Sequence, residues 1–541
     1  MAKATLVTDK TQINSRLSIG EISYYLFFLA LLFAKGIGLY DGQKYFIPFL
    51  MIAYVCWGLK MCLTRYAVKE ILVISILFGL GLLSYLNSGD KSAMIAVMTV
   101  TGMKDVPVGR LFKFGCVLWI ATFVGAVTLA LLELWPTVQV VHDKGGLGYV
   151  IRNSLGMTHP NVLHISYMVL IAFLFLNFKW EGKAVVKPII LSLLGSIYIF
   201  IYSLSYTGFI FLIAYFILIL YFSLRKNISK FERIVIQCLM PLCAGFSLLG
   251  PVLLKGKIFD VINKLVNTRF RLSKHYLTTV RLQLIGQEMN VDGGYSIDCS
   301  YLYCLYYYGV LLFIFFMFGI FFLIKHLLKQ ERKTELAMVL GQVAAGFTEP
   351  FLFTFAFKNL IFPLLGEYLF SMLKQKKCTG KLVFLEKEIQ VIRIEKDVPN
   401  LPEYVIDQSG AYIKAALCDK GKILLAGAMA GLLIGAVASN FIPKPEPYVI
   451  VNKDSSDRVG GRHDYLYYNE LDQEIIDNSI KINLYGENPK VYVFSGSTVE
   501  FEGFRDKVSV IVYGGMLGYL CTGAVFCMIY HKKSRKEEAL T

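Results

Sequence analysis

The sequence predicts an all-α polytopic membrane protein, and two observations carry this prediction. Of its 541 residues, 56% are hydrophobic and only 17% are charged, and the mean hydropathy is +0.56, well above that of an ordinary water-soluble chain. The apolar residues also come in separate blocks of roughly 20 residues, the helix length that crosses a bilayer core of about 30 Å. Strands of a membrane barrel would be shorter and would alternate polar with apolar residues.

The apolar blocks predict about twelve spans in the first 375 residues and two more near the C-terminus. In order, they are residues 20–39, 45–63, 71–86, 92–103, 114–134, 161–178, 187–204, 208–224, 234–253, 301–324, 336–353 and 359–373, then 422–441 and 509–530. The first block is followed at once by a second and lacks a small-residue cleavage site, so we expect a retained anchor rather than a signal peptide. The block at 92–103 is the shortest, but the charge pattern requires it.

Lysine and arginine cluster in every second loop between these spans. With the N-terminus inside, the cytoplasmic clusters are Lys60, Arg65 and Lys69; Lys104, Arg110 and Lys113; Lys179, Lys183 and Lys187; Arg225, Lys226, Lys230 and Arg233; and Lys325, Lys329, Arg332 and Lys333. The short alternate loops hold one basic residue or none, as at Lys44, Lys91 and Lys358. This positive-inside pattern places both termini in the cytoplasm. It also accounts for the net charge of +16 without a nucleic-acid partner, for which no motif is present.

The sequence predicts neither a cofactor nor a metal. Its 11 cysteines are scattered, mostly within spans, and no Cys-x-x-Cys pair occurs, so neither a metal cluster nor a disulfide framework is indicated. No Gly-rich phosphate loop and no Asp-x-Asp metal motif is present.

Two outer loops, at about 135–160 and 255–300, are long and basic. The first carries His142, Lys144, Arg152 and His159, and the second carries Lys255, Lys257, Lys264, Arg269, Arg271, Lys274, His275 and Arg281. Long loops cross a membrane regardless of charge, so one interpretation is a solvated loop beside the headgroups. The other is an anion site, because a guanidinium donates two hydrogen bonds to a phosphate and stays charged.

The loop sequences favour the anion site. Residues 152–161 (RNSLGMTHPN) resemble the Arg…Gly…His-Pro-Asn segment of bacterial surface-polysaccharide polymerases in the O-antigen polymerase and ligase superfamily. The second outer loop and the last two spans of that family are similar to two further groups of residues: Asn267, Thr268, Arg269, Phe270, Gly286, Asp298, Tyr301 and Gly309; and Gly346, Phe347, Thr348, Glu349 and Asn359. These similarities occur in order and cover roughly residues 20–375. Because Arg269 and Arg271 lie so close in sequence, either could take the family position.

The resemblance implies a GT-C-type glycosyltransferase of the bacterial cytoplasmic membrane, metal-independent, with its active face outside the cytoplasm. Such polymerases transfer a growing glycan from a lipid diphosphate, such as undecaprenyl diphosphate, to an incoming lipid-linked repeat unit. The implied residues for diphosphate or sugar binding are Arg152, Arg269, Arg271 and Arg281, and the candidate catalytic residues are His159, Asp298 and Glu349. The implied partners are lipid-linked oligosaccharide and membrane lipids, together with flippase and chain-length regulator proteins.

Several of these residues have a structural alternative. His159 titrates near neutrality, as a base should, but it would equally cap the helix beginning near Pro160. Glu349 lies in an apolar block, where an ionisable group needs a cavity or a partner, and Lys358 would serve as that partner. The turn 203–207 (SLSYT) would reach the same side and contribute to a sugar pocket, while the aromatic run 301–308 is typical of an interfacial belt.

After Lys374 the chain leaves the family pattern. The predicted domains are 1–375, the polymerase-like unit; 376–421, a cytoplasmic linker or small module with a strand at 391–394; and 422–541, a two-span hairpin around an extracytoplasmic region, 443–508, with a strand-like run at 491–494. The Gly- and Ala-rich span 422–441 would pack closely against another helix. The hairpin weakly resembles polysaccharide chain-length regulators, and an appendage with an assembly role is the alternative.

Three other functions stay open at the level of sequence. A ligase of the same superfamily would transfer finished glycan to another acceptor, and a scaffold for an export complex would need no chemistry. A transporter, such as a flippase for lipid-linked oligosaccharide, would place its decisive charges near the bilayer midplane, often in two related halves. No internal repeat is evident, and the basic residues lie in outer loops.

Overall fold

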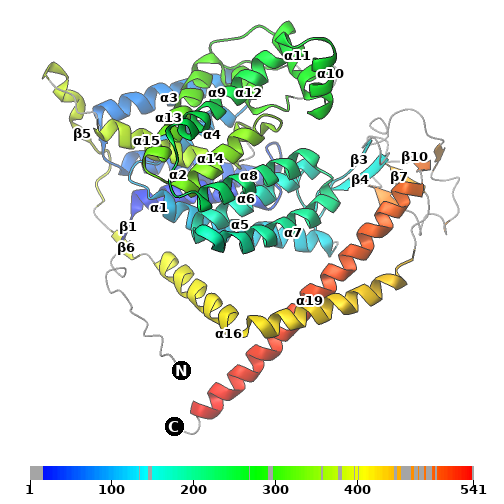
Figure 1. Cartoon of the computed structure of the whole chain (residues 1–541). Coiled ribbons are helices and arrows are strands. Elements are labelled where there is room, and N and C mark those ends of the chain that lie inside the picture. Colours follow the sequence, from blue (N-terminus) through cyan, green and yellow to red (C-terminus); the bar gives the residue numbers. More distant parts are fainter. Residues whose placement is uncertain are drawn as a thin grey trace. The chain divides into compact units, whose positions relative to one another are not determined.

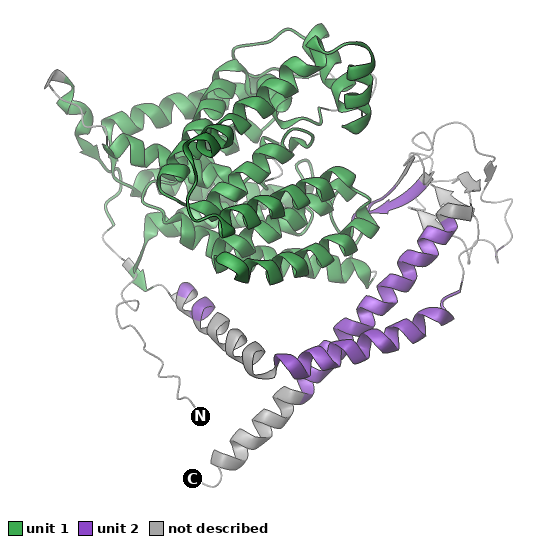
Figure 2. Cartoon of the chain, viewed as in Figure 1, with its two compact units in different colours: residues 1–136, 155–399 green, residues 137–154, 400–541 purple. Residues whose placement is uncertain are grey.

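The computed structural model describes residues 16–132, 134–143, 149–266, 268–289, 297–354, 357–375, 380–394, 397–399, 401–443, 448–451, 465–467, 473, 480–482, 490–493 and 496–538. Among these residues, 11 helices are long and apolar enough to cross a membrane. The chain is therefore an all-α polytopic membrane protein, as predicted. It divides into two compact units, unit 1 (residues 1–136 and 155–399) and unit 2 (residues 137–154 and 400–541), coloured separately in Figure 2.

Unit 1 contains nine of the span-length helices (Figure 1). They are α1 (Ile19–Gly36), α2 (Ile47–Leu63), α3 (Val68–Ser88), α5 (Val108–Leu131), α6 (Pro160–Phe178), α7 (Val186–Ser203), α8 (Tyr206–Leu224), α9 (Lys230–Leu253) and α13 (Val310–Lys329). Two short helices, α10 (Gly256–Leu265) and α11 (Arg269–Thr279), pack together, and α11 lies against α9. The predicted spans 92–103, 336–353 and 359–373 are α4 (Ser92–Thr101), α14 (Lys333–Ala345) and α15 (Ile361–Gln375), with 10, 13 and 15 residues. Each is shorter than the roughly 20 residues that a bilayer core requires.

The short helix α4 nevertheless returns the chain along the length of α3. Beyond α4, the ammonium of Lys104 pairs with Glu70 in the first turn of α3. Before α4, Lys91 follows the end of α3 and pairs at 2.8 Å with Asp41, which follows α1. Since α3 has 21 residues, α4 and the turn after it connect the two ends of a span-length helix. The reversal that the charge pattern requires at 92–103 is therefore present.

The basic loops gather at one end of unit 1, called the basic-loop end below. One pocket there is lined by three of these loops, residues 179–183, 223–226 and 331–335, and a second pocket joins residues 107–109 to Lys179 and Arg332. The Lys333 ammonium also donates to the carbonyl of Arg225 at 2.7 Å. Loops far apart in sequence therefore share one end, as the alternation of charge predicts, and the loops between them share the opposite end.

The predicted continuous span 301–324 is wrong, because the helix breaks at Gly309. The chain forms α12 (Ser300–Tyr303), a π-helical turn (Cys304–Tyr308) and then α13. Gly309 has φ +83°, a conformation that favours glycine. Residues 283–287 pack into the break: the amides of Val310 and Leu311 each donate at 3.1 Å, to the carbonyls of Gln283 and Leu284. The first amides of a helix have no partner within the helix, and a membrane interior holds no water to bond them. These two bonds supply the missing partners for α13.

The predicted linker 376–421 divides between the two units. Its first part is tied to unit 1 by two antiparallel pairings, β5 (Glu388–Ile389) with β2 (Tyr66–Ala67) and β6 (Asp397–Pro399) with β1 (Arg16–Ser18). Its second part begins α16 (Leu401–Ala438) of unit 2. The strand predicted at 391–394 is wrong, because these residues form no strand. The strand of this segment is β5, just before them, which pairs with β2.

Unit 2 combines α16 with a second long helix, α19 (Gly496–Glu538). A Cβ on Gly431 of α16 would lie 2.0 Å from the carbonyl oxygen of Gly514 in α19, so the two backbones touch, as the small residues predict. Strands β3 (Gln139–Asp143) and β4 (Tyr149–Asn153) form one sheet. A second sheet has the order β8-β10-β7-β9, with β7 (Tyr448–Val451), β8 (Tyr465–Tyr467), β9 (Ile480–Ile482) and β10 (Lys490–Val493).

Candidate functional site

Three charged residues that the sequence singles out meet in unit 1. The guanidinium Nη2 of Arg269 donates to Oε1 of Glu349 at 2.9 Å, and its Nε lies 3.9 Å from Oδ2 of Asp298. The hydroxyl of Thr207 donates to the same Glu349 oxygen at 2.7 Å. Helix α8 begins at Tyr206 and ends at Leu224, which lines the pocket at the basic-loop end. Thr207, in the first turn of α8, therefore lies at the opposite end. This group of residues is called the Arg269 cluster below.

Local backbone geometry holds Arg269 and Glu349 in place. Arg269 is the first residue of α11, and Thr268 before it has φ +66°, which costs a β-branched residue about 1–3 kcal/mol. Glu349 has extended backbone between α14 and a short 3₁₀ turn. The hydroxyl of Ser300 donates to the Glu349 carbonyl at 2.5 Å and accepts from the amide of Leu352 at 3.2 Å. Three separate segments therefore fix the cluster.

The Arg269 cluster is enclosed on one side and accessible on the other. The side chains of Arg269 and Glu349 are 7% and 6% exposed, whereas that of Asp298 is 36% exposed. The Nε of Arg269 has no hydrogen-bond partner among the described residues, and neither has the buried hydroxyl of Thr348. Polar atoms of this kind are usually satisfied. The cluster therefore combines a fixed ion pair, one donor without a hydrogen-bond acceptor among the described residues, the Arg269 Nε, and one reachable carboxylate.

The alternative partner expected for Glu349 is wrong. Lys358 makes no ion pair with a described residue, because Arg269 takes that place. The resemblance also left open whether Arg269 or Arg271 is the relevant arginine, and their environments differ. Arg271 is exposed, and its backbone amide donates to the side-chain oxygen of Asn263 at 2.9 Å. Arg281 is exposed as well, and no described contact joins it to the cluster.

His159 has a structural role at the start of α6. Its backbone is extended, and its Nδ1 accepts from the amide of Asn161 at 3.2 Å, directly before Pro160. This is the capping geometry that the sequence offered as the alternative to proton transfer. Arg152 belongs to unit 2, where it lies in β4 opposite Val140 and is 3% exposed.

A paired substitution separates the two roles of His159. We expect His159→Ala to destabilise the protein by about 1 kcal/mol through loss of the cap, and His159→Asn to keep its stability, because asparagine is a good N-cap. Thermal unfolding of the purified variants checks this. A loss of activity in His159→Asn at unchanged stability would then report on proton transfer alone. Equal unfolding midpoints for the alanine variant and the native chain would rule out the cap.

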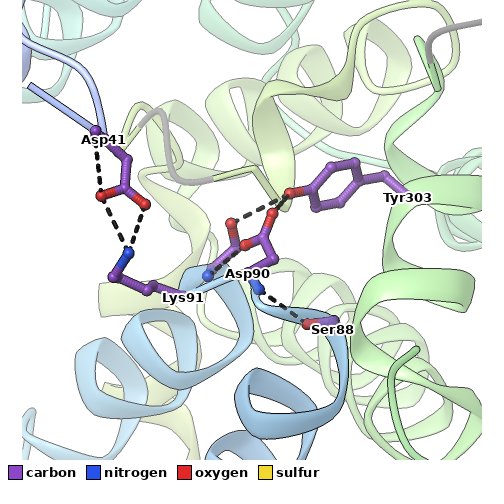
Figure 3. Close-up of polar contacts among 7 residues, drawn as sticks. Asp41, Ser88, Asp90, Lys91 and Tyr303 are labelled. Carbon is purple, nitrogen blue, oxygen red and sulfur yellow. Dashed lines mark hydrogen bonds and ion pairs between the residues drawn. The ribbon is translucent and has the colours of Figure 1, made fainter. Parts of the chain in front are cut away.

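The aromatic run 301–308 is part of the packed interior, not an interfacial belt. Four of its tyrosines are buried, and three hydroxyls donate to backbone carbonyls: Tyr301 to Val343, Tyr306 to Tyr276 and Tyr308 to Phe353, at 2.7–2.8 Å. The fourth, Tyr303, donates to the carboxylate of Asp90, as Figure 3 shows. The tyrosine hydroxyls therefore join this run to α11, to α14 and to the segment that follows α14.

Figure 3 also shows how the loops join at this end of unit 1. Asp90, which bonds Tyr303, is held by a bond from its amide to the Ser88 hydroxyl at 3.1 Å, and the neighbouring Lys91 pairs with Asp41. The loops after α1 and α3 are thereby fixed to one another and to α12.

No protein-family model, no curated protein and no solved structure matches the chain.

Proposed function

We propose that the chain polymerises lipid-diphosphate-linked oligosaccharide units into a surface polysaccharide at the outer face of the cytoplasmic membrane. The observation that carries the proposal is the Arg269 cluster: a buried ion pair with an accessible carboxylate, at the end of unit 1 opposite the basic-loop end. By the positive-inside rule that end faces outward. Ionisable groups enclosed in a membrane protein are costly and commonly functional, and these are the residues that resemble the polymerase family.

The reaction exchanges one bond for another. The acceptor hydroxyl loses its proton as its oxygen bonds to the anomeric carbon of the donor sugar, while the bond from that carbon to the lipid diphosphate breaks and the diphosphate keeps the electron pair. Asp298 is suited to receive the proton, because its carboxylate is the accessible one. Glu349 already accepts from Arg269 and Thr207, which suits a positioning residue.

The charge balance of the cluster changes the expected role of Arg269. Its single positive charge lies beside two carboxylates, so the cluster has no surplus with which to attract a diphosphate. In this proposal Arg269 positions Glu349 and Asp298, and the exposed Arg271 and Arg281 meet the diphosphate as its charge grows. The GT-C type and a chain-length role for α16 and α19 with their outer region belong to the same proposal.

The test replaces Asp298 with asparagine in cells that lack the native gene and resolves their surface glycan by size. We expect single repeat units without long chains, since loss of a general base slows a reaction by about 10²–10⁴, while lipid-linked units still reach the outer face. Units retained inside would indicate a flippase, and long chains left on the lipid would indicate a ligase. Arg225→Ala, at the basic-loop end, is the control. Normal long chains from Asp298→Asn would contradict the proposed base.

A further inference from the structure

Two buried lysines line one pocket at the end of unit 1 opposite the basic-loop end. Lys35 lies in the last turn of α1 and is 8% exposed, and Lys358 lies between α14 and α15 and is 4% exposed. The pocket has a volume of about 330 Å³, within the range of about 300–1,000 Å³ that is usual for ligand sites. It lies wholly within unit 1.

Among the described residues, the ammonium of Lys358 has neither a hydrogen-bond nor an ion-pair partner. Its backbone carbonyl accepts from Gln342 at 3.2 Å. Burial, and secondarily the charge of Lys35, lowers the pKa of Lys358 to about 7. A buried cation without a partner is unfavourable, so the folded chain keeps this group at a cost to its stability.

Lys35 is the second cation that lines this pocket. Its ammonium lies 4.4 Å from the centre of the Phe46 ring, a cation–π contact. Asp41 and Asp90 act on it electrostatically. Asp41 also lines the pocket and pairs with Lys91, and Asp90 keeps its negative charge while it accepts from the Tyr303 hydroxyl (Figure 3). The lysines here, Lys35, Lys91 and Lys358, outnumber the two carboxylates, which leaves one positive charge in excess.

The walls of the pocket are fixed by a close backbone contact. Gly38, directly after α1, has φ +83°, and a Cβ there would lie 2.5 Å from the carbonyl oxygen of Gly156. This contact holds the turn after α1 against residues 156–158, so that Thr158 joins the lining beside Leu39 and Val162, with Tyr40, Asp41 and Met157 also in it. The site is therefore preformed, and two lysines and one aspartate line it among mainly apolar groups.

We propose that this Lys35/Lys358 pocket binds a phosphate-type oxyanion, either a lipid headgroup or a free phosphate. Two ammonium groups suit an anion of more than one negative charge, and phosphate oxygens accept the charge-assisted hydrogen bonds that lysine donates. The Arg269 cluster is not suited to bind this anion, because one arginine beside two carboxylates leaves the cluster with a net negative charge. The inference holds whether or not the chain transfers glycosyl groups.

Binding to the purified full-length protein tests the proposal with two probes. Inorganic diphosphate is titrated calorimetrically against the protein in detergent, and thermal unfolding is measured in phosphatidylcholine nanodiscs with and without phosphatidic acid. The variants are Lys358→Met and Lys35→Met, and the control is Lys44→Met, which removes an exposed lysine from the loop after α1. We expect each pocket variant to weaken binding roughly ten- to hundredfold, as loss of a hydrogen bond to a charged group does. Lys44→Met should bind as the native chain does.

The unliganded protein gives a second readout. Without either probe, Lys358→Met should unfold at a temperature equal to or above that of the native chain, because an unpaired buried ammonium has been removed. If one variant fails to fold, the other still reports on the pocket. Binding of diphosphate indicates a free phosphate, and stabilisation by phosphatidic acid alone indicates a lipid headgroup. A native chain that responds to neither probe, or folded pocket variants that bind as tightly as the native chain, would overturn the proposal.

Discussion

Replacing Glu349 with alanine should lower the free energy of unfolding by up to about 3–5 kcal/mol, because the buried Arg269 would keep only the more distant and more exposed Asp298, at 3.9 Å, as a charge partner. Both side chains are nearly enclosed, at 7% and 6% exposed, so water cannot compensate. The double variant Arg269→Met/Glu349→Leu should recover most of that loss, since apolar residues of similar volume replace a buried ion pair well. Chain growth should stay abolished in both proteins, because the residues that position Asp298 are gone.

Thermal unfolding of the purified variants and glycan sizing in cells measure the two effects separately. The matched control is the Arg225/Glu232 pair, with the same residue types at 2.9 Å but side chains 50% and 24% exposed. Arg225→Met should change neither stability nor chain length measurably, as is usual for surface pairs. Glu232 is kept in this control, because its carboxylate accepts from the Ser229 amide and caps α9. A double variant of the buried pair that regains both stability and long chains would show that the pair is only structural.

Gly309→Val should prevent unit 1 from folding normally. The left-handed backbone would strain a β-branched residue by about 1–3 kcal/mol, and overpacking would add about 1–3 kcal/mol. A Cβ at Gly309 would lie 2.5 Å from the carbonyl carbon of Ile285, and one at Gly286 would lie 2.0 Å from the carbonyl oxygen of Tyr307. The segment that supplies carbonyls to α13 would therefore be displaced, which should make Gly286→Val severe as well.

The yield of monodisperse protein and its unfolding midpoint measure this effect. Gly79→Val is the control, because a Cβ at that position of α3 meets no atom within 4 Å. Equal midpoints for Gly79→Val and Gly309→Val would show that residues 283–287 do not support α13 in the way described.

The sequence predicted those features of the fold that depend on composition along the chain. Apolar blocks located the long helices, and the alternation of charge required the reversal at α4, which the Lys104/Glu70 pair shows. The break at Gly309 could not be predicted in this way, because 301–324 is continuously apolar and the break depends on a distant segment, residues 283–287. Likewise, α14 and α15 are short because residues 349–354 and 357–360 between them are not α-helical, and side chains such as Asn359 satisfy their backbone groups.

The candidate site was predicted in part. Arg269, Asp298 and Glu349 came from a family resemblance, and the structure brings them together, but it gives Glu349 a different partner from Lys358 and places Thr207 beside it. The Lys35/Lys358 pocket was missed, because two single lysines far apart in sequence carry no sign that they are neighbours. An ionisable residue within the first apolar block, Lys35, was the available signal.

The proposed polymerisation is tested most directly with purified protein in vesicles that contain lipid-diphosphate-linked repeat units. The native chain should join single units into a ladder of longer chains and release one lipid diphosphate for each bond formed, and Asp298→Asn should leave the units single. Native protein that carries units across the bilayer without joining them, or leaves them unchanged, would contradict the proposal.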